Sequence, residues 1–132
     1  MILRERLCVT GESRGRVVFV EDEETLRRLG ETILSRMGFE VSAHDNAESA
    51  LAVIQDGAGL VLLATDMSLP GMSGVQLAHQ MRAMGIDAPI LLMSGHDEED
   101  IEEAGGVPAP GCILQKPIGL ADLRACVDDL LR

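Results

Sequence analysis

Tryptophan and tyrosine are absent from this chain, and only two of its 132 residues are phenylalanine. Hydrophobic residues nevertheless make up 46% of the sequence, so a core must be built from aliphatic side chains and methionine. A chain of this length is expected to form one domain, which can bury about two-thirds of the surface that its unfolded form exposes. The composition therefore predicts a single domain with an aliphatic core.

Basic residues are also scarce. The chain has 11 of them against 22 acidic residues, which gives a formal net charge of -11. Binding to a nucleic-acid backbone requires clustered lysine and arginine, so we expect no direct contact with nucleic acid. A negative surface suits cations and basic partner surfaces, although most carboxylates of a small domain only interact with water.

Cysteine is limited to Cys8, Cys112 and Cys126, and their spacing matches neither a CxxC pair nor a zinc site. We therefore expect reduced, partly buried thiols rather than disulfides. No apolar run approaches the roughly 20 residues that cross a membrane. The start, MILRERLC, lacks the apolar stretch of a signal peptide. These absences favour a cytoplasmic protein with no direct membrane contact.

The order of segments predicts the fold. Residues 1–15 show no sustained period and end in a Gly, Ser, Arg cluster, so we expect a tail or linker before one domain at residues 16–132. Within the domain, short β-rich runs alternate five times with helical patterns. Runs such as VVFV and LVLL are apolar throughout, which is typical of parallel strands covered on both faces. Right-handed crossovers then favour a flavodoxin-like, doubly wound α/β sheet of (βα)5 type with strand order 2-1-3-4-5.

Four of the five predicted helices have apolar residues at helical spacing. They cover about residues 24–37, 46–57, 73–85 and 120–131, with Asn46 and Ser73 as N-caps of the second and third. The sequence HDEEDIEEAGG offers only Ile101 and Ala104 to a core, so the fourth helix is expected to be short and easily displaced. The apolar positions expected to face the core from the first and third helices are Leu26, Leu29, Ile33, Leu34, Met37, Val75, Leu77, Met81 and Met84.

Polar residues follow the predicted strands at the edge where such sheets bind ligands. Glu21 and Asp22 follow the first strand, and Asp66 ends the third. Ser94 ends the fourth strand, and Lys116 ends the fifth. Each residue alone has an ordinary explanation as a solvated loop residue, but together at one edge they predict a site.

The predicted site suits phosphoryl transfer. Glu21, Asp22 and Asp66 would repel one another unless a cation neutralised them. A hard, oxygen-seeking ion such as Mg²⁺, or Mn²⁺, fits three carboxylates and retains positions for phosphate oxygens. Asp66 can then act as a nucleophile on phosphorus, while Lys116 and Ser94 contact the transferred oxygens. The chemistry predicted from these residues is acceptance of a phosphoryl group on Asp66.

The segments VVFVEDEETLRRL, LLATDMSLPGMSGVQLA, ILLMSG and LQKP, in this order, resemble the receiver domains of bacterial response regulators and hybrid sensor histidine kinases. The resemblance covers about residues 16–132. It implies that Asp66 is the phosphoacceptor, that Asp22 binds the metal directly, and that Glu21 binds it through water. It further implies that the main-chain carbonyl of Ser68 is a metal ligand.

The same resemblance gives Ser94 and Lys116 their family roles beside the phosphoryl group, and it implies a cis bond between Lys116 and Pro117. Ile113 departs from the family, because an aromatic residue often acts as a switch at that position. His96 lies two residues beyond Ser94, near the expected path of water, so His96 and Ser68 are predicted to tune the lifetime of the phosphoryl group.

The resemblance implies a phosphorelay protein that takes a phosphoryl group from a histidine kinase or a histidine phosphotransfer domain. It would signal by conformational change and dephosphorylate itself slowly, without being a turnover enzyme, and a weak homodimer is expected. The chain ends with the fifth helix, which predicts either a stand-alone receiver or a piece of a longer protein. TGESRGR resembles the linkers before receivers of hybrid kinases, in which case the parent would be a histidine kinase.

Three alternatives use the same fold. A pseudo-receiver would only bind partner proteins, and the complete set of site residues disfavours it. A flavodoxin-like cofactor carrier needs a glycine-rich phosphate loop and an aromatic residue against the flavin, and neither is found. A phosphatase of the haloacid dehalogenase kind needs a second acid two residues after its nucleophile, where this chain has Ser68.

Overall fold

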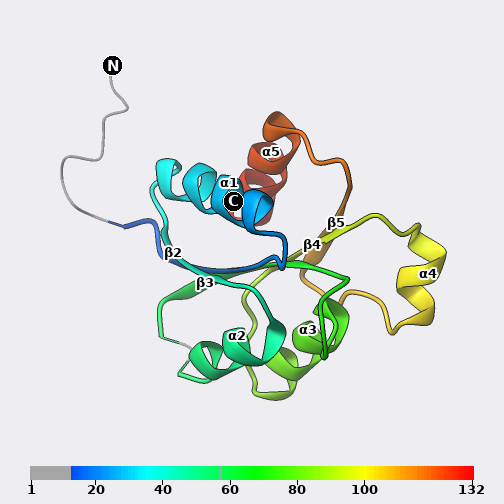
Figure 1. Ribbon diagram of the computed structural model, residues 1–132. Coiled ribbons are helices and arrows are strands. Elements are labelled where there is room, and N and C mark those ends of the chain that lie inside the picture. Colours follow the sequence, from blue (N-terminus) through cyan, green and yellow to red (C-terminus); the bar gives the residue numbers. More distant parts are fainter. Residues whose placement is uncertain (1–12, 57) are drawn as a thin grey trace.

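The computed structural model describes residues 13–56 and 58–132, and Figure 1 shows a central sheet between layers of helices. Most of the predicted tail and Gly57, at the predicted end of the second helix, lie outside the described residues. Strands and helices alternate along the chain as β1 (Arg16–Val20), α1 (Glu24–Arg36), β2 (Glu40–His44), α2 (Ala47–Ile54), β3 (Leu60–Asp66), α3 (Gly74–Ala83), β4 (Ile90–Ser94), α4 (Glu98–Glu103), β5 (Gly111–Gln115) and α5 (Leu120–Leu130).

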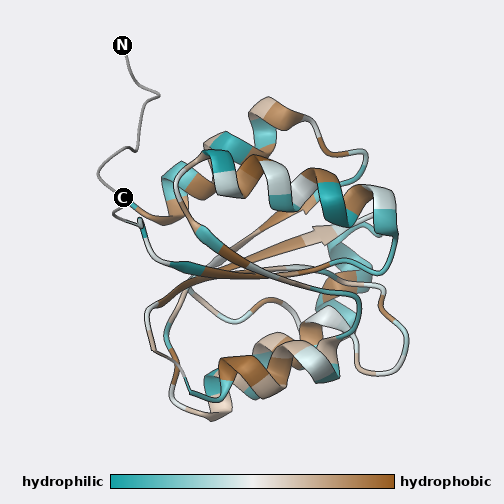
Figure 2. Ribbon diagram, turned by 60° about the vertical axis from the view of Figure 1, so that its left-hand side comes forward, coloured by the Kyte–Doolittle hydropathy of each residue, from teal (hydrophilic) through white to brown (hydrophobic). Residues whose placement is uncertain are grey.

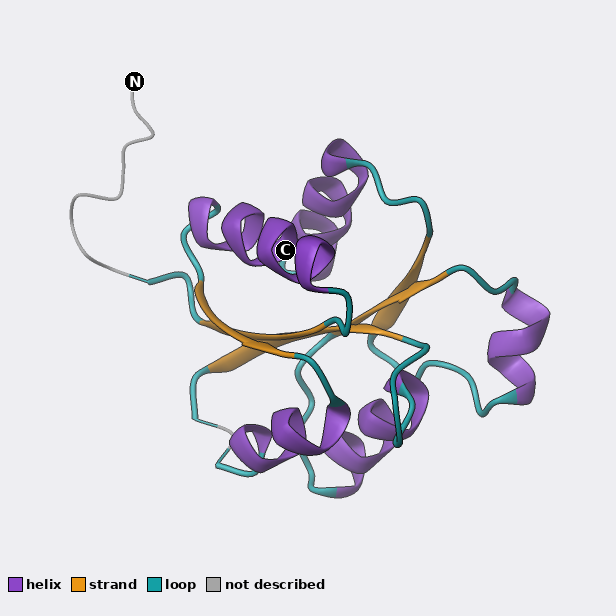
Figure 3. Ribbon diagram, in the orientation of Figure 1, coloured by secondary structure: helices purple, strands orange, loops and turns teal. Residues whose placement is uncertain are grey.

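The five strands are parallel and lie in the order β2-β1-β3-β4-β5, which confirms the predicted topology. Helices α1 and α5 cover one face of the sheet, and α2 and α3 cover the other (Figure 3). Successive residues of a strand point to opposite faces, so Val17 packs with α1 and α5 while Val18 packs with α2 and α3. The central strands are hydrophobic over most of their length (Figure 2), because both of their faces are covered.

The helix ends follow local side-chain chemistry. Asn46 caps α2 by accepting a hydrogen bond from the Ser49 N–H (2.7 Å). Ser73 and Gln76 form a reciprocal capping box at the start of α3, with hydrogen bonds of 3.1 and 2.8 Å. Both predicted N-caps are therefore confirmed.

Some residues expected in the core are exposed. On α1, Leu34 and Met37 are buried, but 39% of Leu26 and 56% of Leu29 remain accessible. Periodicity identifies the apolar side of a helix, but in the N-terminal half of α1 this side lines a groove between α1 and the start of α5. Met84 is likewise 37% exposed at the end of α3, and Ala104 at the end of α4 is exposed.

Helix α4 has only six residues, as the sequence predicted, and lies beside the β4–β5 end of the sheet (Figure 1). Its one buried residue, Ile101, packs with Val75 and Leu92. Beyond its C-terminal end, the His79 imidazole donates from Nε2 toward the carbonyls of Gly105 and Gly106, both at 3.0 Å. A few contacts therefore hold this helix to the domain.

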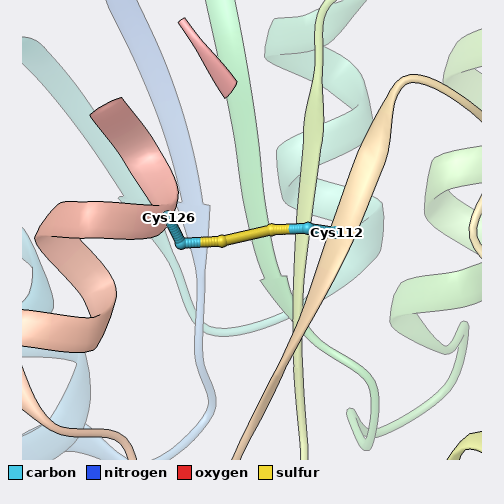
Figure 4. The surroundings of a disulfide bond; sticks show 2 residues. All are labelled: Cys112 and Cys126. Atoms are coloured by element: carbon cyan, nitrogen blue, oxygen red, sulfur yellow. A yellow bond between two sulfur atoms is a disulfide. The ribbon is translucent and has the colours of Figure 1, made fainter. Parts of the chain in front are cut away.

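The prediction of reduced thiols is wrong for two of the three cysteines. Cys112 on β5 and Cys126 on α5 form a disulfide (Figure 4). The residues are 14 positions apart, and only the packing of α5 against β5 brings them together, so their spacing gave no signal. Cys8 lies outside the described residues. Within the described part of the chain, no helix is long and apolar enough to cross a membrane.

Candidate functional site

Three carboxylates meet at the carboxyl edge of the sheet. Glu21 and Asp22 follow β1, and Asp66 ends the adjacent strand β3. One carboxylate oxygen from each lies within 4.8 Å of the others. Glu21 and Asp66 are only 2% and 5% exposed, whereas Asp22 is open to solvent. The strand order thus creates a half-buried acidic cluster.

Lys116 joins this cluster from the other side of β4. Its Nζ donates to Asp66 Oδ2 at 2.8 Å and to Glu21 Oε1 at 3.2 Å. The Lys116 backbone N–H donates to the Ser94 carbonyl at 2.8 Å, and the bond to Pro117 is cis, as the resemblance implied. The ammonium group is therefore fixed beside the Asp66 carboxylate.

The electrostatics of the cluster leave negative charge uncompensated. Burial raises the pKa of Glu21; the Glu23 N–H and Lys116 oppose this effect, and the charge of Asp66 adds to it. Burial alone would lower the pKa of Lys116, but its hydrogen bonds and charge interactions with Asp66 and Glu21 raise it overall. Lys116 is consequently a cation at neutral pH, and it contacts two of the three acidic groups, Asp66 and Glu21.

This donor set fits a hard divalent cation. Carboxylate oxygens are the ligands that Mg²⁺ prefers, and Mg²⁺ requires only one or two of them together with water. Lys116 contacts Oδ2 of Asp66, and the Ser68 N–H donates to Oδ1 at 3.3 Å. The Asp22 carboxylate is exposed, so this side of the acidic cluster is open to water. The residues therefore match the chemistry of a magnesium site.

Gly74 positions the site, although no sequence argument had identified it. A Cβ atom there would lie 2.1 Å from the carbonyl oxygen of Asp66. The Gly74 N–H also donates to the Met67 carbonyl at 2.9 Å, so the start of α3 rests directly on the end of β3. The glycine after the Ser73 cap was the available signal, but its close contact is visible only in the folded chain.

Ser94 is fully buried, and its hydroxyl is bonded to neighbours other than Asp66. Its Oγ donates to the Met67 sulfur at 3.6 Å and accepts the His96 N–H at 2.9 Å. A role beside a phosphoryl group would therefore require the Ser94 hydroxyl to direct its proton away from the Met67 sulfur.

The structure also brings Ser68 and His96 together. Ser68 Oγ lies 3.1 Å from His96 Nε2. On its other side, His96 Nδ1 lies 3.8 Å from a carboxylate oxygen of Asp100 in the first turn of α4. Ile113 lies outside the acidic cluster. Its half-buried side chain packs against the small hydrophobic cluster that contains Ile101 of α4.

A mostly apolar groove of about 730 Å³ opens beside the acidic cluster, between α1 and the start of α5. Glu21 and Lys116 form part of its lining. The exposed leucines Leu26, Leu29 and Leu120 line it as well. An approaching partner would therefore meet an apolar surface next to Asp66 and Lys116.

Comparison with known proteins identifies similar sequences. Residues 17–128 match the family model of the response regulator receiver domain. The chain is 28% identical to the response regulator receiver protein CpdR of Brucella abortus, covering 88% of this chain and 96% of CpdR. It is 35% identical to the transcriptional regulatory protein PrrA of Mycobacterium leprae, covering 93% of this chain and 52% of PrrA. The chain thus spans nearly all of CpdR but about half of PrrA.

Solved structures have the same fold. A response regulator receiver protein from Sinorhizobium medicae superimposes with a TM-score of 0.79 at 28% identity, covering 89% of this chain and 94% of that one. The receiver domain of the hybrid histidine kinase CckA gives a TM-score of 0.75 at 30% identity, covering 89% of this chain and 100% of that one.

Proposed function

The chain belongs to the response regulator receiver domain family of two-component signalling, and we propose that Asp66 accepts a phosphoryl group from a phosphohistidine with the help of Mg²⁺. Domains of this family are phosphoacceptors rather than turnover enzymes. The observation that carries the proposal for this chain is the Asp66 carboxylate, which is buried within an acidic cluster and bonded to Lys116 at 2.8 Å.

In the proposed transfer, a carboxylate oxygen of Asp66 forms a bond to phosphorus as the bond between phosphorus and the histidine nitrogen breaks. When bound, the divalent ion supplies positive charge for the phosphoryl oxygens. Glu21, Asp22 and Asp66 would hold the ion, with the Ser68 carbonyl as the further proposed ligand. Lys116 contributes a second positive charge, and the Ser94 hydroxyl provides a hydrogen bond after leaving Met67.

Mass spectrometry after incubation with acetyl phosphate and Mg²⁺ tests the proposal. The wild-type protein should gain one phosphoryl group, and Asp66→Asn should gain none, because an amide is a poor nucleophile. Asp45→Asn, which changes an exposed carboxylate just after β2, is the matched control and should be labelled normally. Stable labelling of Asp66→Asn would overturn the assignment. A wild-type protein that accepts no phosphoryl group from any donor would favour a pseudo-receiver.

Metal binding has a separate test. Mg²⁺ that binds only the folded state should stabilise it, by about 2.7 kcal/mol at a concentration one hundred times the Kd. Asp22→Ala should remove most of this effect. Because the chain has no tryptophan or tyrosine, calorimetry or circular dichroism is the suitable measurement. An unchanged melting temperature of the wild type across a Mg²⁺ titration would count against the metal site.

We further propose that the phosphodonor docks on α1 and the loop after β5, where the apolar groove adjoins Asp66 and Lys116. Leu29→Glu should slow transfer from a phosphorylated histidine kinase or phosphotransfer domain and leave labelling by acetyl phosphate unchanged. Met84→Glu is the control, because this partly exposed residue follows directly after α3, on the opposite face of the sheet. Cross-links to the far edge near Arg16 and Ala88 would contradict this docking site.

The lifetime of the phosphoryl group is proposed to depend on Ser68 and His96. Their side chains are 3.1 Å apart, and the Ser68 N–H contacts the Asp66 carboxylate. This arrangement supports a role for both residues in admitting or orienting water.

We also propose that the chain is the receiver part of a hybrid histidine kinase. The similarity of the chain to the CckA receiver domain supports this proposal.

A further inference from the structure

His96 connects the acidic cluster to helix α4. Its backbone N–H donates to Ser94 Oγ at 2.9 Å, and its carbonyl accepts from Gln115 Nε2 at 3.0 Å. These two bonds fix the backbone on both sides of the ring. The ring itself lies between Ser68, with Nε2 at 3.1 Å from Oγ, and Asp100, with Nδ1 at 3.8 Å from Oδ2. The imidazole thus links the loop after Asp66 with the first turn of α4.

The Asp100 carboxylate is chemically significant for the imidazole. A neutral histidine carries one proton, and a carboxylate beside Nδ1 favours the tautomer with that proton on Nδ1. In this tautomer Nε2 has an available lone pair, which can accept a hydrogen bond from the Ser68 hydroxyl. The separation of 3.8 Å is long for a direct hydrogen bond, and a small rotation of the ring or of the Asp100 side chain would close it.

We propose that Asp100 is a positioning residue for hydrolysis of the aspartyl phosphate, acting through the tautomer of His96. This inference rests on phosphorylation of Asp66. The oxygen of a water molecule forms a bond to phosphorus while the bond from phosphorus to the Asp66 oxygen breaks. Asp66 returns as a carboxylate, and both water protons leave on dihydrogen phosphate. His96 Nε2 releases the Ser68 hydroxyl, accepts a hydrogen bond from the attacking water and aligns it.

The position of α4 then controls the lifetime of the phosphoryl group. Asp100 belongs to a helix of six residues that is anchored through one buried side chain, Ile101. His96 is held separately, by Ser94 and Gln115. A displacement of α4 would therefore carry Asp100 away from the ring and leave the ring in place. A partner that holds α4 against the domain should speed hydrolysis, and one that displaces it should slow hydrolysis.

The first test is the decay of the phosphoryl group after labelling with acetyl phosphate and removal of the donor. Asp100→Ala should slow the decay by about tenfold, the lower end of the range known for removal of a residue that orients a metal-binding histidine. Glu99→Ala is the control, since it removes the same charge from the adjacent exposed position of α4. The phosphoryl group of His96→Ala should decay about as slowly as that of Asp100→Ala. The double variant should decay no more slowly than either single variant, because both substitutions remove the same interaction.

The second test is the ¹⁵N chemical shifts of the His96 ring in the unphosphorylated protein. The wild type and Glu99→Ala should show the Nδ1–H tautomer, and Asp100→Ala should shift toward Nε2–H. A purely structural role of Asp100 would not change this signature. If the wild type is labelled and Asp100→Ala decays at the wild-type rate, or if the wild-type ring carries its proton on Nε2, the inference fails and Asp66 remains the phosphoacceptor. A wild type that is never labelled would instead contradict the proposed function.

Discussion

Among single residues, Gly74 shows how closely the backbone of α3 approaches Asp66. The 2.1 Å separation between an added Cβ and the Asp66 carbonyl cannot be relieved by rotating a side chain, because the obstructing atom belongs to the backbone. Gly74→Ala should therefore destabilise the fold by about 1–3 kcal/mol, the usual range for overpacking, and weaken Mg²⁺ binding. Urea denaturation measures the first effect, and calorimetry the second.

Gly95→Ala is the matched control for this prediction. A Cβ at Gly95 meets nothing within 4 Å, and its φ lies outside the left-handed region. It should change the stability by less than about 0.5 kcal/mol. Equal effects of the two substitutions would show that the close approach at Gly74 does not constrain the end of β3.

Glu21 should make the stability of the metal-free protein depend on pH. Its folded pKa is raised above 4.5 chiefly by burial, so the neutral carboxyl group fits the fold better than the charged one. This contribution to stability is fully present below pH 4.5 and is lost as the pH rises through the folded pKa.

Glu21→Gln keeps a neutral side chain at this position. With a chelator present to remove divalent ions, the Glu21→Gln protein at pH 7 should be more stable than the wild type by about 1 kcal/mol. The difference in stability should vanish below the ordinary pKa of the carboxyl group. Thermal denaturation between pH 4 and pH 8 provides the measurement. If the wild type is as stable as Glu21→Gln at pH 7, or more stable, then burying the charged Glu21 carboxylate does not destabilise the fold.

At the scale of elements, α1 and β1 meet through a glycine and a phenylalanine. A Cβ at Gly30 would lie 2.3 Å from the end of the Phe19 ring, so the glycine allows α1 to pass over this ring. Gly30→Ala should destabilise the wild type by about 1–3 kcal/mol. In a Phe19→Leu background the same substitution should be much less harmful, because leucine lacks the obstructing ring atoms.

A double-mutant cycle from urea denaturation measures this coupling, which should exceed about 0.5 kcal/mol. Additive effects of the two substitutions would mean that the ring moves aside at little cost.

Helix α4 is the element predicted to respond most to phosphorylation. Binding of Ser94 to a phosphoryl group would break its hydrogen bond to Met67, and the same Oγ accepts the N–H of His96, which leads directly into α4. Ile113 has no aromatic ring to rotate, and β5 is joined to α5 by the Cys112–Cys126 bond. Beryllofluoride with Mg²⁺ should therefore change amide chemical shifts strongly over residues 94–106 and weakly over residues 112–127, apart from Lys116.

His79→Phe gives a further check, because it removes the hydrogen bonds to the Gly105 and Gly106 carbonyls. It should accelerate hydrogen exchange in α4 and leave α2 unchanged. Chemical-shift changes along α5 as large as those in α4 would show that the signal takes another route.

For the whole molecule, the disulfide contributes to stability by restricting the unfolded chain. Closing a loop of about 15 residues is worth roughly 3 kcal/mol in the chain-entropy account. A reducing agent should therefore lower the melting temperature of the wild type and leave the Cys112→Ala/Cys126→Ala variant unchanged. Alkylation of the denatured protein, before and after reduction, should label the peptides of these two cysteines only after reduction. Equal labelling of both peptides without reduction would contradict the bond.

Much of the fold follows from local patterns in the sequence. Runs such as Val17–Val20 are apolar without alternation, which requires cover on both faces and thus predicts a parallel sheet between helices. Asn46 and Ser73 could be assigned as caps because a cap bonds to a residue three positions away. The strand order then places Glu21, Asp22 and Asp66 at one edge, so their meeting was also predictable.

Only the tertiary structure decided which residues distant in sequence come within a few ångströms of one another. Such contacts depend on how the elements pack, which the sequence patterns do not encode. They include the Cys112–Cys126 pair, the approach of Gly74 to Asp66 and the link from His96 to Asp100. The exposure of Leu29 has the same origin, because periodicity defines the apolar side of α1 while the spacing of α1 and α5 determines what covers it. The sequence by itself determined which chemical groups reach the carboxyl edge, since each of them follows an apolar run and parallel strands end at a common edge. Their distances, partners and burial were decided by packing, since these depend on every element at once.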